Sequence, residues 1–245
     1  MVDMDFWREY YSDNKNLEKI SYYSKYREIV IMRETKGHKL VLRPCKIFKP
    51  EHLDYYIKRL NLTENLFDIY HSVASVKIPF PISSNFKKIK EDREQLNLNF
   101  MKWITGFDLF IDTDIETDAD RPKAREYAIS LTLELRKKGY EKTELWDTSR
   151  GFHCWNRGRW DVLFIKNLVM DTCCELGIPM SMPIKEINGK RYKTQDKKWV
   201  EMKPNEAVPV GSKPWVDVSI YDYRRIKRIP FSLHSKTGKP MVKVQ

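Results

Sequence analysis

The chain has 245 residues, of which 41% are hydrophobic and 13% aromatic, and its formal net charge is +11. This composition excludes a disordered chain and allows one large domain or two small ones. No apolar run approaches the roughly 20 residues that a membrane-spanning helix needs, and the first residues lack the pattern of a secretory signal. We therefore expect an intracellular protein without a membrane partner, in the cytoplasm or nucleoid, or in the nucleus of a eukaryote.

The four cysteines are Cys45, Cys154, Cys173 and Cys174. None has the C-x-x-C spacing of a structural zinc site, and the adjacent pair falls in a helix-like segment. We therefore expect neither structural zinc nor a disulfide framework, which agrees with a reducing compartment.

The positive charge is concentrated in two segments. Residues 223–245 contain seven Lys or Arg and no acid, and residues 185–203 contain seven Lys or Arg against three acids. Such segments favour a polyanionic partner, either nucleic acid or nucleotide phosphates, although basic surfaces also arise for solubility.

The first third of the chain predicts helices and a hairpin. Residues 5–29 place aromatic and charged residues at helical spacing. The apolar runs 28–35 and 38–48, joined by a Lys-Gly turn, indicate a β-hairpin. Residues 49–62 then predict a short amphipathic helix, and residues 78–84 form a proline-rich connection.

The middle of the chain predicts a strand, a helix and a strand. Residues 106–114, "GFDLFIDTD", read as a buried strand. A helix over 121–140 follows, with Pro122 near its start and Gly139 near its end, and with one face formed by Ala128, Leu131 and Leu135. Residues 143–149 form the next strand, so this order favours an α/β layer.

The remaining elements are a helix, an excursion and a basic loop. Residues 161–178 predict a second amphipathic helix. Residues 186–202 contain an Asn-Gly turn signal and predict an excursion or hairpin. Residues 215–240 begin as a strand and end in a basic loop.

Two carboxylates end the apolar strand at 106–114. Asp112 and Asp114 project to one face, whereas Thr113 points to the other. Two hard oxygen ligands suit Mg²⁺ or Mn²⁺, but D-x-D also occurs in glycosyltransferases, phosphatases and strand ends without a catalytic role. Asp217 is a lone carboxylate in the strand-like run "PWVDVSI", or else an edge residue facing solvent. Three carboxylates on neighbouring strands would hold the two ions of phosphoryl transfer.

The other acids near this strand are expected to be structural. We place Asp108 at the entrance of the strand, and Asp118 and Asp120 in a polar stretch as solvated or helix-capping residues.

Basic side chains occur in two further segments. "DTSRGFHCW" places Arg150 and His153 around Gly151 directly after a strand, where glycine allows the backbone to approach a ligand and both side chains can donate to phosphate. A histidine beside aromatic residues is, however, more often simply packed. "RIKRIPFSLHSKTG" adds Arg228, His234 and Lys236.

Three segments, taken in order, resemble a known family. "DLFIDTD", "DTSRGFHCW" and "KRIPFSLHSKTG" are similar to the three motifs of the catalytic (small) subunit of archaeo-eukaryotic DNA primases, and residues 26–48 loosely resemble its early hairpin. The resemblance implies an α+β (mixed α/β) fold with central mixed or antiparallel sheets flanked by helices. It also implies one catalytic domain over 1–245, with an N-terminal α/β part at about 1–100 and a metal- and nucleotide-binding part at about 101–245.

The resemblance also assigns site residues. It implies that Asp112, Asp114 and Asp217 bind two Mg²⁺ or Mn²⁺ ions. It implies that the incoming nucleotide's triphosphate is bound by five residues: Ser149, Arg150, His153, Arg228 and His234. Glu28 and Arg43 would lie near the primer end or the nucleotide, with Lys236 as a further candidate.

The chain departs from the family at two positions of the second motif and in its extent. Ser149 stands where the family often has an arginine, and Asp147 where it often has serine. The Cys/His zinc module that many members carry between the first two motifs has no counterpart here, and the chain ends soon after the third motif. We therefore expect a minimal catalytic core.

The function implied is template-directed primer synthesis from nucleoside triphosphates. The expected partners are a single-stranded DNA template and a primer duplex, whose backbone the two basic segments would contact. Replicative primases also use a large accessory subunit, although a short form could act alone.

Four other functions stay open. The first is a repair-type polymerase of the same superfamily that extends primers without starting chains. A D-x-D metal-dependent glycosyltransferase would leave the basic third region unexplained, and a haloacid-dehalogenase-like phosphatase is disfavoured because residue 116 is Glu. A non-enzymatic nucleic-acid binder would give no reason for buried carboxylates.

Overall fold

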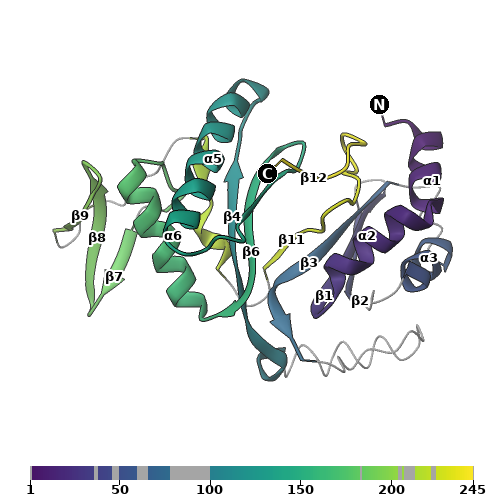
Figure 1. Cartoon of the computed structure of the whole chain (residues 1–245), viewed down its shortest axis with the longest axis horizontal. Coiled ribbons are helices and arrows are strands. Elements are labelled where there is room, and N and C mark those ends of the chain that lie inside the picture. The colour runs from purple at the N-terminus through teal and green to yellow at the C-terminus, as the bar shows by residue number, and fades with distance from the viewer. Residues whose placement is uncertain are drawn as a thin grey trace. The chain divides into compact units, whose positions relative to one another are not determined.

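The computed structural model describes residues 2–35, 38–45, 50–59, 66–77, 100–182, 184–203, 206, 213–221 and 225–244. The Lys-Gly turn at 36–37 and the proline-rich segment 78–84 lie outside the described residues. The chain divides into two compact units: unit 1 comprises residues 1–106 and 223–242, and unit 2 comprises residues 107–222 and 243–245. Their helices and antiparallel strand ladders confirm the α+β fold class (Figure 1).

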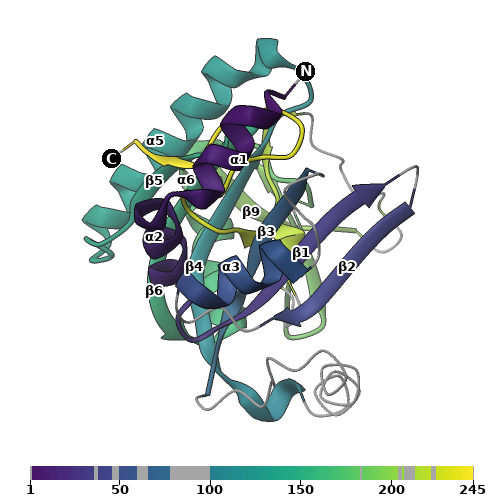
Figure 2. The ribbon, with the colours of Figure 1, turned by 90° about the vertical axis from the view of Figure 1, so that its right-hand side faces the viewer.

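Unit 1 contains the predicted hairpin in an antiparallel sheet. The spatial order is β2-β1-β3, and β11 pairs with β3 on its other edge. Among the described residues of this unit, three helices accompany the sheet (Figure 2). The bounds are α1 Met4–Ser12, α2 Asn14–Ser24, β1 Arg27–Thr35, β2 His38–Cys45, α3 Pro50–Arg59, β3 Phe67–Val76, a 3-10 turn η2 Phe100–Trp103 and β11 Ile226–Arg228.

The helical pattern over residues 5–29 folds as two helices, because Asp13 interrupts it, and its last three residues belong to strand β1 instead. Asp13 takes an extended conformation, and its carboxylate accepts a hydrogen bond from the backbone N–H of Lys15, which caps α2. Aromatic packing then fixes α1 on the sheet, since Trp7 meets Phe67 edge-to-face at 5.5 Å.

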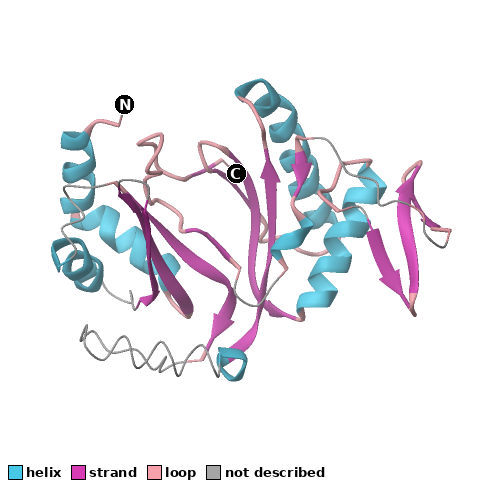
Figure 3. Ribbon diagram, turned by 180° about the vertical axis from the view of Figure 1, so that it is seen from behind, coloured by secondary structure: helices cyan, strands magenta, loops and turns pink. Residues whose placement is uncertain are grey.

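Unit 2 contains a strand ladder in the order β12-β5-β6-β4, in which β6 runs antiparallel to both β4 and β5, and β10 pairs with the end of β4. Helices α5 and α6 lie along one side of it (Figure 3). The bounds are β4 Ile104–Asp114, a 3-10 turn η3 Asp118–Asp120, α5 Arg121–Lys137, β5 Glu144–Asp147, β6 Gly151–Trp160, α6 Val162–Leu176, β10 Trp215–Val216, a 3-10 turn η4 Val218–Ile220 and β12 Val242–Lys243.

Strand β6 was not predicted as a strand. It follows β5 after a tight turn and lies between β4 and β5, antiparallel to both. The predicted strand–helix–strand unit therefore exists as β4–α5–β5, but its two strands are separated by β6. The predicted apolar face of α5 is confirmed, because Ala128, Leu131 and Leu135 are all buried.

A small three-stranded sheet replaces the hairpin expected at 186–202. Its strands are β7 Ile184–Ile187, β8 Lys190–Gln195 and β9 Lys198–Glu201. The predicted turn is confirmed at Asn188 and Gly189, which both adopt the positive φ angles that Asn-Gly favours. Asp171 of α6 ties the sheet to the helix by accepting hydrogen bonds from Lys185 and from Trp199 Nε1.

The prediction for Asp108 was wrong. It lies in the middle of β4, fully buried, rather than at the strand entrance. Its carboxylate accepts hydrogen bonds from Trp155 Nε1 at 2.7 Å and from the Gly158 N–H at 3.1 Å, and these offset the cost of burying the charge. Asp108 is therefore a structural residue of β4 and β6.

Two smaller observations complete the fold. Asp120 accepts hydrogen bonds from the backbone N–H groups of Glu116 and Thr117 and so completes the capping box of η3, whereas its side chain makes no cap hydrogen bond to α5. Among the described helices, none has an apolar stretch long enough to span a bilayer.

Candidate functional site

Asp112 and Asp114 lie at the end of β4, between two neighbouring strands. Asp114 pairs with Gly151 of β6 on one side and with Trp215 of β10 on the other. Both carboxylates are partly exposed, whereas Thr113 between them is buried. This alternation puts the two carboxylates on the same face of the sheet, as the sequence predicted.

Asp217 comes directly after β10 and lies opposite Asp112. Its N–H donates to the carbonyl of Asp112 at 2.9 Å, so the backbones of the two residues are adjacent. The Asp217 side chain is 8% exposed, and its Oδ1 accepts hydrogen bonds from the Ser219 N–H at 2.9 Å, from Ser219 Oγ at 2.6 Å and from Ser181 Oγ at 3.2 Å. Sequence reasoning missed these two serines, which fix the orientation of the carboxylate.

The donor chemistry of this cluster fits a hard divalent cation, because all three acids offer carboxylate oxygens. The geometry fits only in part. Within the described ranges, no three His, Cys, Asp or Glu side chains are grouped so that they could hold a metal ion together. The Oδ1 of Asp217 is already bonded to serines.

His153 is the basic neighbour of Asp112. It lies opposite Asp112 in the β4–β6 ladder, and its Nε2 is 3.5 Å from Asp112 Oδ1. Its ring packs edge-on against Phe110 at 4.7 Å and is 6% exposed. Packing against Phe110 therefore holds the imidazole of His153 next to Asp112.

Gly151 is required at the start of β6. A Cβ on this residue would lie 2.6 Å from the carbonyl oxygen of Thr113, closer than any side chain could approach. The glycine therefore lets β6 start against the D-x-D strand.

The residues between β5 and β6 form a tight turn. The Thr148 N–H donates to the Gly151 carbonyl at 3.1 Å, and Asp147 Oδ1 accepts from the Ser149 N–H at 2.7 Å. Ser149 adopts φ +66°, which a non-glycine residue holds only where its neighbours fix it. Arg150 follows with an exposed side chain. Asp147 in turn binds Arg121 of α5, with Nη2 at 2.6 Å from each carboxylate oxygen.

The third basic segment belongs to unit 1. Arg228 lies in β11, paired with Tyr70 of β3, and is 6% exposed. His234 follows in a turn, where its carbonyl accepts from Gly238 N–H at 2.8 Å and its Nδ1 accepts from Lys236 N–H at 3.1 Å. Lys236 itself is exposed.

Helix α1 and strand β3 fix this basic loop, which the sequence did not predict. Tyr10 Oη donates to the Phe231 carbonyl at 2.6 Å, and Tyr11 Oη accepts from the Leu233 N–H at 3.0 Å. Asp68 accepts from the Ser235 N–H at 2.9 Å. Burial raises the pKa of Tyr10 to about 12 and also raises the pKa of Tyr11, so both hydroxyls stay protonated and keep these bonds.

Glu28 and Arg43, the early-hairpin candidates, form an ion pair inside unit 1. Arg43 Nε and Nη2 each donate to one Glu28 oxygen at 2.8 Å, and Glu28 is fully buried. The Glu28 N–H also donates to Ser72 Oγ, which links β1 to β3. This bidentate geometry gives the pair a structural role in the sheet.

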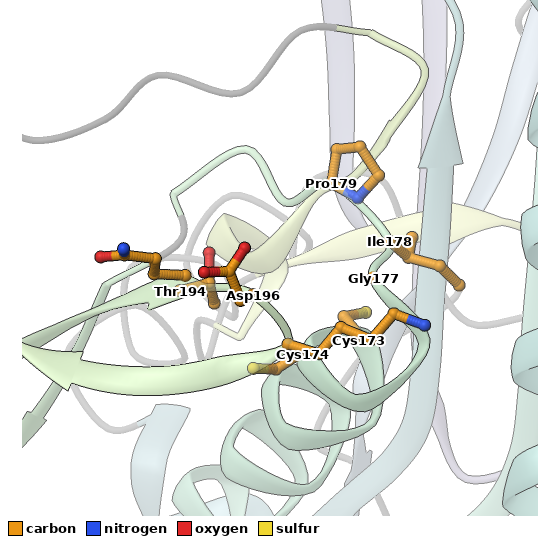
Figure 4. A pocket seen from close by; sticks show the side chains of 9 residues that line it. Cys173, Cys174, Gly177, Ile178, Pro179, Thr194 and Asp196 are labelled. Carbon is orange, nitrogen blue, oxygen red and sulfur yellow. The ribbon is translucent and has the colours of Figure 1, made fainter.

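A separate pocket lies between the end of α6 and the β8–β9 turn (Figure 4). Its volume of about 220 Å³ is below the roughly 300–1,000 Å³ of most ligand pockets. Burial raises the pKa of Cys173 and Cys174, so these thiols are not activated. None of the candidate site residues lines this pocket, which comprises Cys173, Cys174, Gly177, Ile178, Pro179, Thr194, Gln195, Asp196 and Lys197.

Comparisons with known proteins identify the fold. No protein-family model matches the sequence, and no curated protein matches it either. Among solved structures, the chain is similar to the polymerase domain of ligase D from Mycobacterium tuberculosis, which was solved in complex with DNA. That match has a TM-score of 0.51 and 10% identity, and covers 93% of this chain and 75% of the other. The chain therefore has a primase-polymerase-like fold.

Proposed function

We propose that this protein is a template-directed nucleotidyltransferase that makes DNA primers from nucleoside triphosphates. The observation that carries the proposal is the set of backbone pairings around Asp112, which bring Asp114, Asp217, His153 and the second-motif turn to the end of one strand. The fold shared with a polymerase domain supports the same class of reaction.

Asp112 and Asp114 would hold a pair of Mg²⁺ or Mn²⁺ ions, with Asp217 as the third ligand through the oxygen that its serines do not occupy. Divalent ions at such a site lower the pKa of an attacking hydroxyl and neutralise phosphate charge. Ser181 and Ser219 keep Asp217 oriented, since both donate to its Oδ1. Because these serines already hold the carboxylate in place, the Asp217 side chain would need to rearrange less when a metal ion binds.

The chain's own cations would bind the triphosphate. His153 stands beside Asp112, and Arg150 is presented by the turn with an exposed side chain. Charge-assisted hydrogen bonds from these groups, and from Ser149, would orient the phosphates and stabilise the charge that develops on them. We propose that Arg228 and His234 bind phosphate as well, as the family resemblance implies.

The proposed partners are a single-stranded template and a primer duplex. The exposed basic residues of β8 and β9, including Arg191 and Lys198, suit contacts with a nucleic-acid backbone. Such binding would weaken steeply with salt. An accessory subunit is a further proposal that rests on the resemblance alone.

The test is nucleotide incorporation on a single-stranded template with Mg²⁺ or Mn²⁺. We expect the wild type to make product and Asp112→Asn/Asp114→Asn to make none, because the isosteric amides keep the fold but lose the ligand charge. Wild-type incorporation by that double variant would refute the assignment.

The polymerase domain named above supports a second candidate, namely a polymerase that extends primers without starting chains. Reactions with and without a primer separate the two, because only a primase yields product from an unprimed template. Transfer from a nucleotide-sugar without incorporation on any template would instead favour a D-x-D glycosyltransferase.

A further inference from the structure

The ion pair between Arg121 and Asp147 lies at the turn that carries Ser149 and Arg150. Arg121 begins α5, and its Nη2 is 2.6 Å from both oxygens of Asp147 at the end of β5. The guanidinium also stacks over the ring of Phe152, with 4.9 Å between its carbon and the ring centroid. Both partners are only partly exposed, at 29% and 28%.

The same carboxylate shapes the turn. Asp147 Oδ1 accepts a hydrogen bond from the Ser149 N–H at 2.7 Å, which supports the left-handed conformation of Ser149. Arg121 therefore restrains the acceptor on which the turn depends. Asp147 and Ser149 are also the two positions at which the second motif departs from its family pattern.

Arg121 acts from behind the sheet. Phe152 lies opposite Asp147 in the β5–β6 ladder and opposite Thr113 in the β4–β6 ladder. Directly opposed residues share a face, so Asp147 and Phe152 lie on the face of Thr113, which is the reverse of the Asp112 face. A nucleotide held at Asp112 would thus lie on the opposite face of the sheet from Arg121. The carboxylate of Asp147 also compensates the charge of Arg121.

We infer that Arg121 is a positioning residue. Through Asp147, it holds the second-motif turn in the conformation that binds a nucleoside triphosphate, without contacting the nucleotide. This inference rests on the proposed function, because it gives a role to a neighbour of the same site. It also explains why an acid occupies position 147 here.

The test measures triphosphate affinity directly and incorporation separately. ATP and dATP are titrated calorimetrically into wild type, Arg121→Ala, Asp147→Ala and the double variant, and incorporation gives KM and kcat for each. We expect Arg121→Ala to raise Kd and KM by about threefold to tenfold and to leave kcat within about twofold. Asp147→Ala should do at least as much, and the double variant no more than Asp147→Ala, because the residues act in series.

Conservative variants and a control keep the test informative where an alanine variant does not fold. Asp147→Asn retains an acceptor for the Ser149 N–H and should recover part of the affinity. Arg121→Lys keeps the charge but loses the planar group that stacks on Phe152, and it should be intermediate. Arg125→Ala, an exposed arginine one turn along α5, should match the wild type.

Several results would overturn the inference. Wild-type triphosphate affinity in Arg121→Ala, or fully additive effects in the double variant, would show that the pair does not position the turn. Tighter binding in Asp147→Ala would show that Arg121 contacts phosphate itself, and a wild type that binds no triphosphate would remove the turn's role. A wild type that incorporates no nucleotide, but whose triphosphate binding still weakens in Arg121→Ala, would reject the proposed function and support the inference.

Discussion

Gly151→Ala tests the close approach between the second motif and the D-x-D strand. Gly151 begins β6 and pairs with Asp114, and an added Cβ would lie 2.6 Å from the Thr113 carbonyl oxygen. Cβ atoms essentially never come within 3.0 Å of another atom in this way, so the strands must separate by at least the difference of 0.4 Å. Because the obstacle is backbone, no side-chain rotation can relieve the contact.

The expected cost has two parts. Overpacking a well-packed site costs about 1–3 kcal/mol, so the free energy of unfolding should fall by that amount. The separation also moves Asp114 and the turn, and displacements approaching 1 Å in an active site reduce rates by up to about 100-fold. We therefore expect incorporation to fall by about tenfold or more, beyond what unfolding explains.

Urea denaturation measures the first part and nucleotide incorporation by the folded protein measures the second. Gly139→Ala is the matched control: its φ is +94° and no atom lies within 4 Å of the added Cβ. It should lose about 1–2 kcal/mol from backbone strain and keep its activity. If Gly151→Ala keeps wild-type stability and activity, the close approach of β6 to β4 is wrong.

Three further predictions concern the supporting structure. Tyr221→Phe should lower the free energy of unfolding by about 1 kcal/mol in urea, because the Tyr221 hydroxyl donates to the Phe110 carbonyl at 2.7 Å; no change would show that the bond is not needed. The folded-state pKa of Tyr10 is raised to about 12, so the contribution of this tyrosine to stability is complete below pH 10 and is lost as pH rises through 12. The urea midpoint of Tyr10→Phe should therefore fall less between pH 9 and 11 than that of the wild type. Equal falls in the two midpoints would contradict this. Iodoacetamide should leave Cys154 and Cys173 unmodified in the native protein, because burial raises the pKa of both thiols, and peptide mapping that finds either labelled would contradict their burial.

The periodic elements could be predicted from sequence because their causes are local. Apolar spacing fixed the face of α5, and Asn-Gly fixed the β7–β8 turn. Strand β6 was missed because "GFHCWNRGRW" lacks a clear alternation of polar and apolar residues: its first half is buried on both faces. Burial of that kind depends on β4, β5 and the helices, which a local pattern does not reveal.

The candidate site was predicted in its acids and histidine but not in its supporting residues. Asp112 and Asp114 stand in one short motif, and the strand period alone gives their shared face. His153 stands in the second motif, but its place opposite Asp112 depends on β6. Ser181 and Arg121 come from distant segments, and only the folded chain brings them to Asp217 and Asp147. Ser219 is two residues from Asp217, and its contact comes from the local turn after β10. Asp108 shows the converse, since a carboxylate near the motif proved to be structural because of a tryptophan 47 residues later.

The most direct test of the central claim is a crystal structure with Mn²⁺ and a non-hydrolysable nucleoside triphosphate, in which anomalous scattering locates the metal. We predict manganese at about 2.1–2.3 Å from oxygens of Asp112 and Asp114, with phosphate oxygens in contact with the turn at Ser149 and Arg150. Manganese and triphosphate bound elsewhere, with both carboxylates left in solvent, would contradict the account.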